Sequence, residues 1–157
     1  SESVMVNKLY QDAKNRATKN GVVKRDLVLP SVFINVYDKM PPLKDNEERL
    51  EKLLEDSEIL PDDEVDLGFF IGNEVGVCRH HSLACGVLIE LFKKEGYIFG
   101  TPSIDRNQTV FEAHTLCRYT ASTGDIWILD VASGYYGSLE KSLEEYNWDY
   151  RRPNEMV

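Results

Sequence analysis

The sequence predicts an α+β fold in which a buried helix packs against an antiparallel sheet. At 157 residues the chain has the length of one domain, so we expect a single domain over 1–157. Segment 79–94 is apolar nearly all round in its middle, which is typical of a buried helix. Two strand-like segments follow it along the chain: 110–119, which alternates, and 125–131, which is strongly apolar. A buried helix followed by a hairpin indicates an α+β protein.

The charge balance argues against several classes of function. The chain carries 18 Lys and Arg against 27 Asp and Glu, a net charge of −9, and its pI is about 4.8. Because phosphate-binding surfaces need clustered cations, we expect no nucleic-acid partner. Hydrophobic residues make up 42% and charged residues 29%, a globular rather than a disordered composition.

Cysteine number and hydropathy bear on the compartment. Three cysteines, an odd number in a chain of this size, predict free thiols in a reducing environment. No segment approaches the roughly 18 apolar residues of a membrane-spanning helix, so we expect no membrane partner. Residues 1–5 lack the charged region and the apolar core of a signal peptide, so we expect a cytoplasmic location. The sequence does not begin with an initiator Met, which suggests an excised domain.

The first part of the chain, 1–65, is expected to be mainly helical. Residues 9–20, closed by Gly21, form a polar helix pattern with a glycine C-cap. Residues 22–40 contain many β-branched side chains before a Pro-Pro pair, which predicts extended or mixed structure. Residues 45–60 have the apolar stripe of an amphipathic helix.

The second half predicts a helix and a sheet. The helix over 79–94 is expected to end before Gly96, with a short strand at 97–100 and a polar loop up to Gln108. Segment 110–119 alternates as a strand does, and 125–131 is strongly apolar. Their five-residue, turn-rich connection predicts an antiparallel hairpin.

Cys78 is the candidate nucleophile, because it stands where a loop enters the buried helix. Unpaired N–H groups and the positive end of the helix dipole favour a thiolate at that position. The same N–H groups can bind a developing oxyanion. The alternative is that Cys78 is a small buried hydrophobic residue.

His114 and Asp130 complete a candidate triad. A cysteine nucleophile needs an imidazole to take and return a proton, and the imidazole needs an acid to fix its tautomer. His114 lies within the first hairpin strand and Asp130 closes the second. Antiparallel pairing brings them together if the register places both side chains on one face.

The order of these residues resembles the transglutaminase-like superfamily, a variant of the papain-like fold. The resemblance covers about 68–133 and rests on Gly-x-Cys-Arg at 76–79, Ala-His at 113–114 and Trp-x-x-Asp-Val-Ala at 127–132. The spacings resemble compact bacterial cores, including glutamine-deamidating toxin and effector domains. The resemblance implies a papain-like core, in which a helix with Cys78 at its N-terminus packs on an antiparallel sheet.

The resemblance also implies an activity. Cys78 would be the nucleophile, His114 the general base and acid, and Asp130 the orienting group of an acyl transferase or hydrolase. Its partner would be a protein with a reactive glutamine, and a lysine or small amine could accept the acyl group. A papain-like cysteine protease and a catalytically silent interaction domain remain alternatives. Delivery into a host cytosol is then an alternative location, and no cofactor is implied.

Other polar residues near Cys78 have competing interpretations. The papain-like fold often supplies an oxyanion-hole amide shortly before the nucleophile, and Asn73 is the nearest candidate, although the segment contains no Gln. For His80 and His81 we favour capping or packing, and Arg79 is a candidate partner for a nearby acidic group.

A zinc site is the rival interpretation of the cysteines and histidines. Cys78, His81 and Cys85 occur at helical spacing, and Cys117 follows His114 by three residues. Residues three apart on a strand point to opposite faces, and the chain lacks a Cys-x-x-Cys motif. We therefore expect no metal, and we expect Cys85 and Cys117 to be core thiols.

The C-terminal part is rich in aromatic residues. Tyr135, Tyr136 and the segment 146–150, which includes Trp148, have this character. They could line a substrate cleft or bind a partner, but we favour simple packing.

Overall fold

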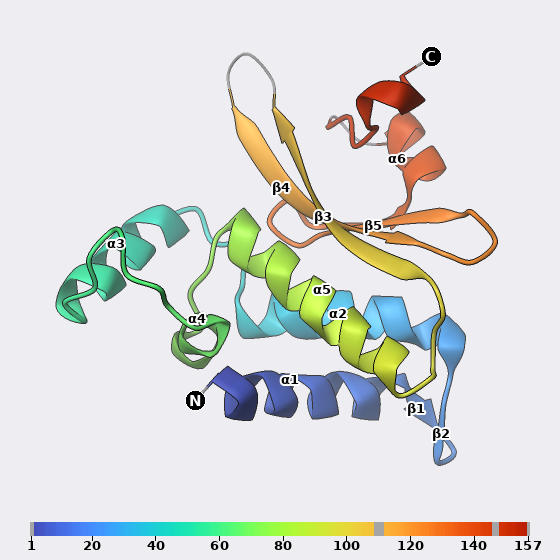
Figure 1. The fold of residues 1–157 in the computed structure, drawn as a ribbon, viewed down its shortest axis with the longest axis horizontal. Helices are drawn as coiled ribbons and strands as arrows, with labels where there is room; N and C mark the ends of the chain where they lie inside the picture. Colours follow the sequence, from blue (N-terminus) through green and yellow to red (C-terminus); the bar gives the residue numbers. More distant parts are fainter. Residues whose placement is uncertain (1, 109–111, 146–147, 157) are drawn as a thin grey trace.

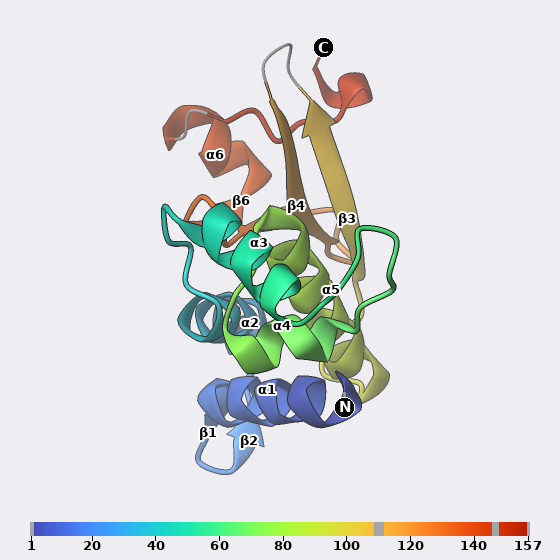
Figure 2. The same cartoon turned by 90° about the vertical axis from the view of Figure 1, so that its left-hand side faces the viewer.

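The computed structural model describes residues 2–108, 112–145 and 148–156. Figures 1 and 2 show a layer of helices beneath a twisted sheet, with the C-terminal segment above the sheet. In chain order the elements are α1 (Glu2–Ala17), β1 (Thr18–Lys19), β2 (Val22–Val23), α2 (Arg25–Lys39), α3 (Asn46–Asp56), α4 (Leu67–Asn73), α5 (Cys78–Lys94), β3 (Thr101–Gln108), β4 (Ala113–Thr120), β5 (Ile126–Asp130), β6 (Tyr135–Ser138), α6 (Leu139–Glu145) and the 3₁₀ turn η1 (Pro153–Glu155).

The main sheet has the order β3-β4-β5-β6, and every neighbouring pair is antiparallel. The predicted α+β class and the β4–β5 hairpin are confirmed. The predicted buried helix is α5, which begins at Cys78 and is followed by Gly96 at φ 85°. The predicted amphipathic helix is α3. The predicted strand positions Val110 and Phe111 lie outside the described residues.

Alternation along β4 separates two clusters of buried side chains. Cys117 and Tyr119 face the helices and join a core shared by α1, α2, α4 and α5. Leu116 faces the other way, into a smaller cluster with Tyr135 and Tyr150. Because successive strand residues point to opposite faces, this single strand contributes to both layers. The sheet is therefore covered by helices on one face and by the C-terminal segment on the other (Figure 2).

The prediction of extended or mixed structure over 22–40 is wrong, because most of that segment is the helix α2. Val28, Val32 and Val36 are fully buried and recur every four residues, so they form one apolar helical face. Burial of that face outweighs the weak helix propensity of valine, about 0.5 kcal/mol per residue. It also outweighs the hydrogen bond that Pro30, inside the helix, cannot make.

The first helix also differs from the prediction. Helix α1 spans Glu2–Ala17 rather than 9–20, and it ends where a small hairpin begins. Asn20 and Gly21 have φ of 52° and 77°, the positive values that a tight two-residue hairpin turn requires. The Asn-Gly pair is therefore the turn between β1 and β2 instead of the end of a helix.

The predicted loop before Gln108 is the edge strand β3, and the short strand expected at 97–100 is absent from that described segment. Strand β3 pairs along its whole length with β4. Among the described residues no strand pairs with its outer edge, and half of its side chains are exposed. It therefore carries polar residues without the apolar alternation of an inner strand.

None of the described helices alone is long and apolar enough to cross a membrane. Helices α4 and α5 meet the length and composition criteria together, but they are bent by 108° relative to each other.

Candidate active site

Cys78 is the first residue of α5, and its side chain is partly buried. Val77 before it is extended, with φ −116° and ψ −174°, so the chain turns into the helix at the cysteine. The first N–H groups of a helix have no acceptor within the helix. As the first residue of the helix, Cys78 therefore lies at the positive end of the helix dipole.

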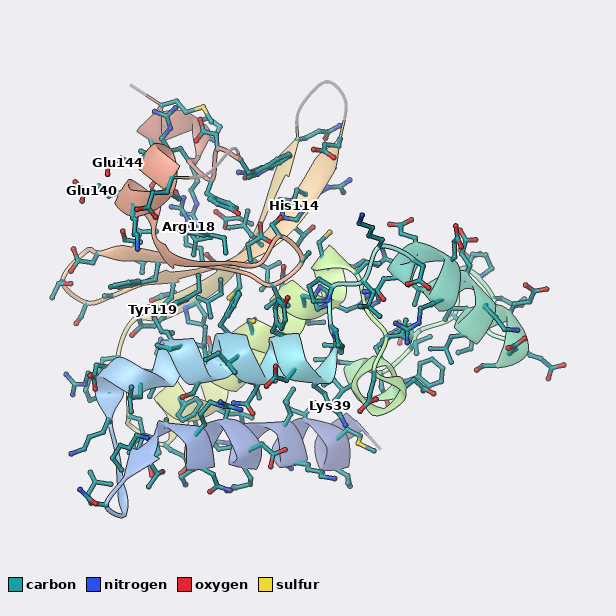
Figure 3. All side chains as sticks on the ribbon, turned by 180° about the vertical axis from the view of Figure 1, so that it is seen from behind. Lys39, His114, Arg118, Tyr119, Glu140 and Glu144 are labelled. Carbon is teal, nitrogen blue, oxygen red and sulfur yellow. The ribbon has the colours of Figure 1, made fainter. Side chains whose placement is uncertain are left out.

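The β4–β5 register brings His114 and Asp130 together. Cys117 pairs with Leu129, so Asp130 lies diagonally across from His114 on the same face of the sheet. Their side chains meet, with 2.7 Å between His114 Nε2 and Asp130 Oδ2. Asp130 is 1% exposed and His114 15%, so the pair is largely shielded from water. Figure 3 shows His114 on β4, further from the β4–β5 turn than Arg118.

The His114 ring also interacts with the thiol of Cys78. This hydrogen bond lowers the pKa of Cys78 below its ordinary 9.0 although burial opposes it, and Thr115 contributes backbone and side-chain hydrogen bonds. Burial disfavours the charged imidazole, but hydrogen bonds to Asp130 and Cys78 outweigh it and raise the pKa of His114 to about 10. The two shifts are opposite in direction, so the contact favours transfer of the Cys78 proton to the His114 ring.

Asp130 has two further hydrogen-bond donors. Tyr150 Oη donates to Asp130 Oδ2 over 2.7 Å, and the Ser133 N–H donates to Oδ1 over 3.3 Å. Tyr150 is fully buried. Together with His114, these donors contact both carboxylate oxygens, so they fix the orientation of the Asp130 side chain.

The C-terminal strap, residues 148–156, covers this face of the site. The Trp148 ring meets the His114 ring edge to face, with centroids 5.2 Å apart. Tyr150 stacks on Tyr135, with centroids 5.7 Å apart. The expectation that the aromatic tail packs is confirmed for these residues, while Tyr146 lies outside the described ones.

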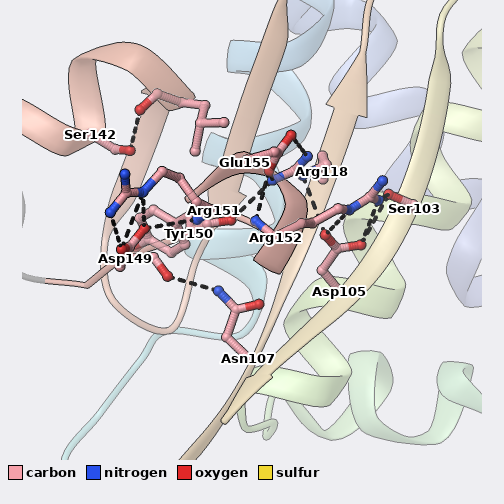
Figure 4. A network of polar contacts seen from close by, with 11 residues as sticks. Ser103, Asp105, Asn107, Arg118, Ser142, Asp149, Tyr150, Arg151, Arg152 and Glu155 are labelled. Atoms are coloured by element: carbon pink, nitrogen blue, oxygen red, sulfur yellow. Dashed lines mark hydrogen bonds and ion pairs between the residues drawn. The ribbon is translucent and has the colours of Figure 1, made fainter. Parts of the chain in front are cut away.

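Arg118 of β4 holds the strap on the sheet. It is 1% exposed, and its Nη2 donates to Tyr150 O over 3.0 Å and to Glu155 Oε1 over 2.7 Å. On its other side it forms an ion pair with Asp105, which also binds Arg152 of the strap over 2.8 Å. Figure 4 shows this network. It positions the backbone of Tyr150, and with it the donor to Asp130.

The structure gives Asn73 a different role from the expected oxyanion-hole amide. Its Nδ2 donates over 2.8 Å to Phe69 O, one turn back in its own helix, and the side chain is exposed. Such local bonds to a preceding carbonyl are common for short amide side chains. The structure therefore does not bring Asn73 together with Cys78, His114 and Asp130, and leaves the backbone N–H groups at the start of α5 as the candidate oxyanion donors.

His80 and His81 have the capping and packing roles that the sequence predicts. The Val77 N–H donates to His80 Nδ1 over 3.0 Å, which caps the start of α5. His81 is 1% exposed and its Nε2 donates to Met40 O over 2.7 Å. Both interactions fix the helix end that carries Cys78.

The other two cysteines are core thiols, as expected. Cys85 and Cys117 are completely buried, and all three cysteines are free. Burial raises the pKa of both, that of Cys117 to about 12. Within residues 2–108, 112–145 and 148–156, no group of three or more His, Cys, Asp or Glu side chains is arranged to hold a metal ion.

Comparison with known proteins gives no relative for this chain. No protein-family model matches it, and no curated protein or solved structure is significantly similar to it.

Proposed function

We propose that the chain is a cysteine-dependent acyl transferase with a papain-like, transglutaminase-like core. The observation that carries the proposal is the alignment of Cys78 at the start of α5, His114 beside it and Asp130 2.7 Å from His114. The opposite pKa shifts of Cys78 and His114 are those of an activated nucleophile and its acid. A purely structural cysteine such as Cys85 has neither feature.

The proposed acyl donor is the side-chain carboxamide of glutamine in a protein partner. The Cys78 thiolate attacks the carboxamide carbon, and the oxygen gains negative charge that backbone N–H groups at the start of α5 stabilise. The carbon–nitrogen bond then breaks as the His114 imidazolium gives its proton to the leaving nitrogen. Ammonia departs, and a thioester on Cys78 remains.

The second half of the cycle releases the acyl group. His114, now neutral, takes a proton from water or from a primary amine as that molecule attacks the thioester carbon. The carbon–sulfur bond breaks and the thiolate re-forms beside the imidazolium. Water gives a glutamate, a lysine gives an isopeptide cross-link, and a small amine gives a substituted amide. Asp130 keeps its hydrogen bond to the His114 ring and holds the imidazole in place.

The motifs around Cys78, His114 and Asp130 are the reason for choosing a glutamine carboxamide over a peptide bond, since they resemble transglutaminase-like cores. A thiolate needs a reducing environment to persist, so we also propose that the chain works in a cytosol, its own or that of a host. The absence of disulfides among its three cysteines is consistent with that setting.

A two-part assay tests the proposal. The protein is incubated with a glutamine-containing peptide, once with a fluorescent primary amine and once without it, and the products are resolved by mass spectrometry. We expect amine incorporation with loss of ammonia, or conversion of the carboxamide to a carboxylate. Cys78→Ala should abolish both reactions.

The matched control is Cys85→Ala, the same substitution at a core thiol. It should retain activity, because Cys85 lies outside the triad. Cleavage of the peptide backbone instead of its side chain would replace the proposal with a protease. Unchanged peptide with every donor and amine tested would contradict acyl transfer.

A further inference from the structure

A cavity of about 730 Å³ lies beside the first turn of α5. Its walls come from α3 and the following loop, from Phe70 of α4, and from Arg79 and His80. Figure 1 shows α3 standing off the helical layer, near the end of α5 where Cys78 lies. Arg79 and His80 directly follow Cys78 in the sequence, so two residues that line the cavity are chain neighbours of the proposed nucleophile.

The cavity has an acidic rim and an apolar floor. Its acidic residues are Glu51, Glu55, Glu58 and Asp63. Its apolar residues include Leu54, Ile59, Val65 and Phe70. The described lining contains these four acidic residues and one basic residue, Arg79, so the net charge around the cavity is negative. Clustered charge of one sign in a hollow attracts a ligand of the opposite sign.

His80 adds a hydrogen-bond donor that has no acceptor. The Val77 N–H donates to His80 Nδ1, so the ring carries its own proton on Nε2. His80 is 8% exposed, and no described residue accepts a hydrogen bond from that Nε2–H. His80 Nε2 is not among the fully buried unpartnered atoms of the described residues, so this N–H is accessible and can donate to an oxygen of a ligand.

We propose that this cavity docks a basic and apolar segment of a protein partner. Lysine or arginine side chains of the segment would meet the glutamates, and its apolar side chains would cover the floor. A main-chain carbonyl would accept the hydrogen bond from His80 Nε2–H. A free polyamine matches the charge alone, since it has neither carbonyl nor apolar side chain. That the partner is the glutamine substrate rests on the proposed function.

Peptide binding to the intact chain, measured by fluorescence anisotropy, tests the proposal. The probes are labelled peptides of alternating lysine and leucine, of glutamate and leucine, and of lysine and serine. None contains glutamine, so binding is measured apart from catalysis. Unlabelled spermidine serves as a competitor.

The test variant is Glu51→Lys with Glu55→Lys, on the exposed side of α3. The matched control is Glu140→Lys with Glu144→Lys on α6, which changes the net charge equally. Figure 3 labels this glutamate pair, on the opposite side of the molecule from α3.

We expect the lysine–leucine peptide to bind most tightly of the three. At low salt the α3 variant should weaken it about tenfold and the α6 control less than about twofold, and added salt should reduce the difference. Spermidine at matched charge should not displace it. Equal losses in both variants would show attraction to an acidic chain in general and overturn the proposal. So would equal binding of the lysine–serine or glutamate–leucine peptide, or displacement by spermidine.

This binding result is separable from the proposed function. An inactive chain that binds the peptide selectively would leave the cavity assignment in place and refute acyl transfer. An active chain that does not bind the peptide selectively would support acyl transfer and overturn the cavity assignment.

Discussion

Tyr150 donates its hydroxyl proton to Asp130 Oδ2 over 2.7 Å, the same oxygen that His114 Nε2 contacts. The two residues come from different segments of the chain, since His114 lies on β4 and Tyr150 on the C-terminal strap. The strap is held by Arg118, which is buried between Glu155 and Asp105. The orientation of Asp130 therefore depends on the C-terminal strap, a segment that follows Asp130 in the sequence by many residues.

Replacing Tyr150 with phenylalanine tests that dependence. Tyr150→Phe removes one donor to a buried carboxylate, and we expect the free energy of unfolding to fall by about 1–3 kcal/mol. Because Asp130 is then held less firmly, His114 should stabilise the thiolate less, and the pH profile of Cys78 alkylation should move upward. Denaturant unfolding and alkylation rates against pH measure the two effects.

Tyr135→Phe is the matched control, because the Tyr135 hydroxyl donates to Ser138 O over 2.9 Å in the same cluster. It should leave the alkylation profile of Cys78 in place. If both variants shift the profile equally, Tyr150 acts through packing alone and the positioning role is wrong.

The orienting carboxylate can be tested without changing its size. Asp130→Asn turns an acceptor of the His114 proton into an amide, which favours the wrong tautomer of the ring. By analogy with other triads we expect acyl transfer to fall about 10²–10⁴-fold, with the fold retained. Steady-state kinetics and circular dichroism measure this. Full activity in a folded Asp130→Asn variant would exclude Asp130 from the mechanism.

The ion pair between Arg118 and Glu155 should make stability depend on acidic pH. Hydrogen bonds from Arg118 outweigh burial and lower the pKa of Glu155 from 4.5 to about 2. A lowered folded-state pKa stabilises the fold fully above the ordinary value, and this contribution is lost as the pH falls from about 4.5 toward 2. We expect Tm to decline across that window.

Glu155→Gln should flatten this decline, because the titrating group is gone. Exposed Glu144 of α6 provides the comparison, and Glu144→Gln should keep the wild-type slope. A slope that is the same in all three proteins would mean that Glu155 does not contribute to acid unfolding. Thermal unfolding at a series of pH values provides the data.

Local patterns in the sequence were sufficient to find Cys78, His114 and Asp130. A helix boundary and a hairpin are short-range features, and strand alternation already assigns each residue to a face. The register remained open, because a shift of one residue in the turn moves Asp130 to the other face. The observed pairing of Cys117 with Leu129 decides it.

The parts that could not be predicted involve long-range contacts. Tyr150 meets Asp130 through a strap without regular secondary structure at that point, so no periodicity marks the contact. The one available signal is that Trp148 and Tyr150 stand two apart, as residues on one side of an extended segment do. Strand β3 was missed because its polar sequence is stabilised by pairing with β4, and α2 because burial outweighs its β-branched composition.

The most direct test of the account is the alkylation rate of each cysteine against pH, followed by peptide mass spectrometry in wild type and His114→Ala. We predict that Cys78 titrates below its ordinary pKa of 9.0, while Cys85 and Cys117 stay protected. His114→Ala should return Cys78 to the profile of an ordinary thiol. A Cys78 that titrates as an ordinary thiol in wild type, unchanged by His114→Ala, would contradict the thiolate–imidazolium pair and the proposed function with it.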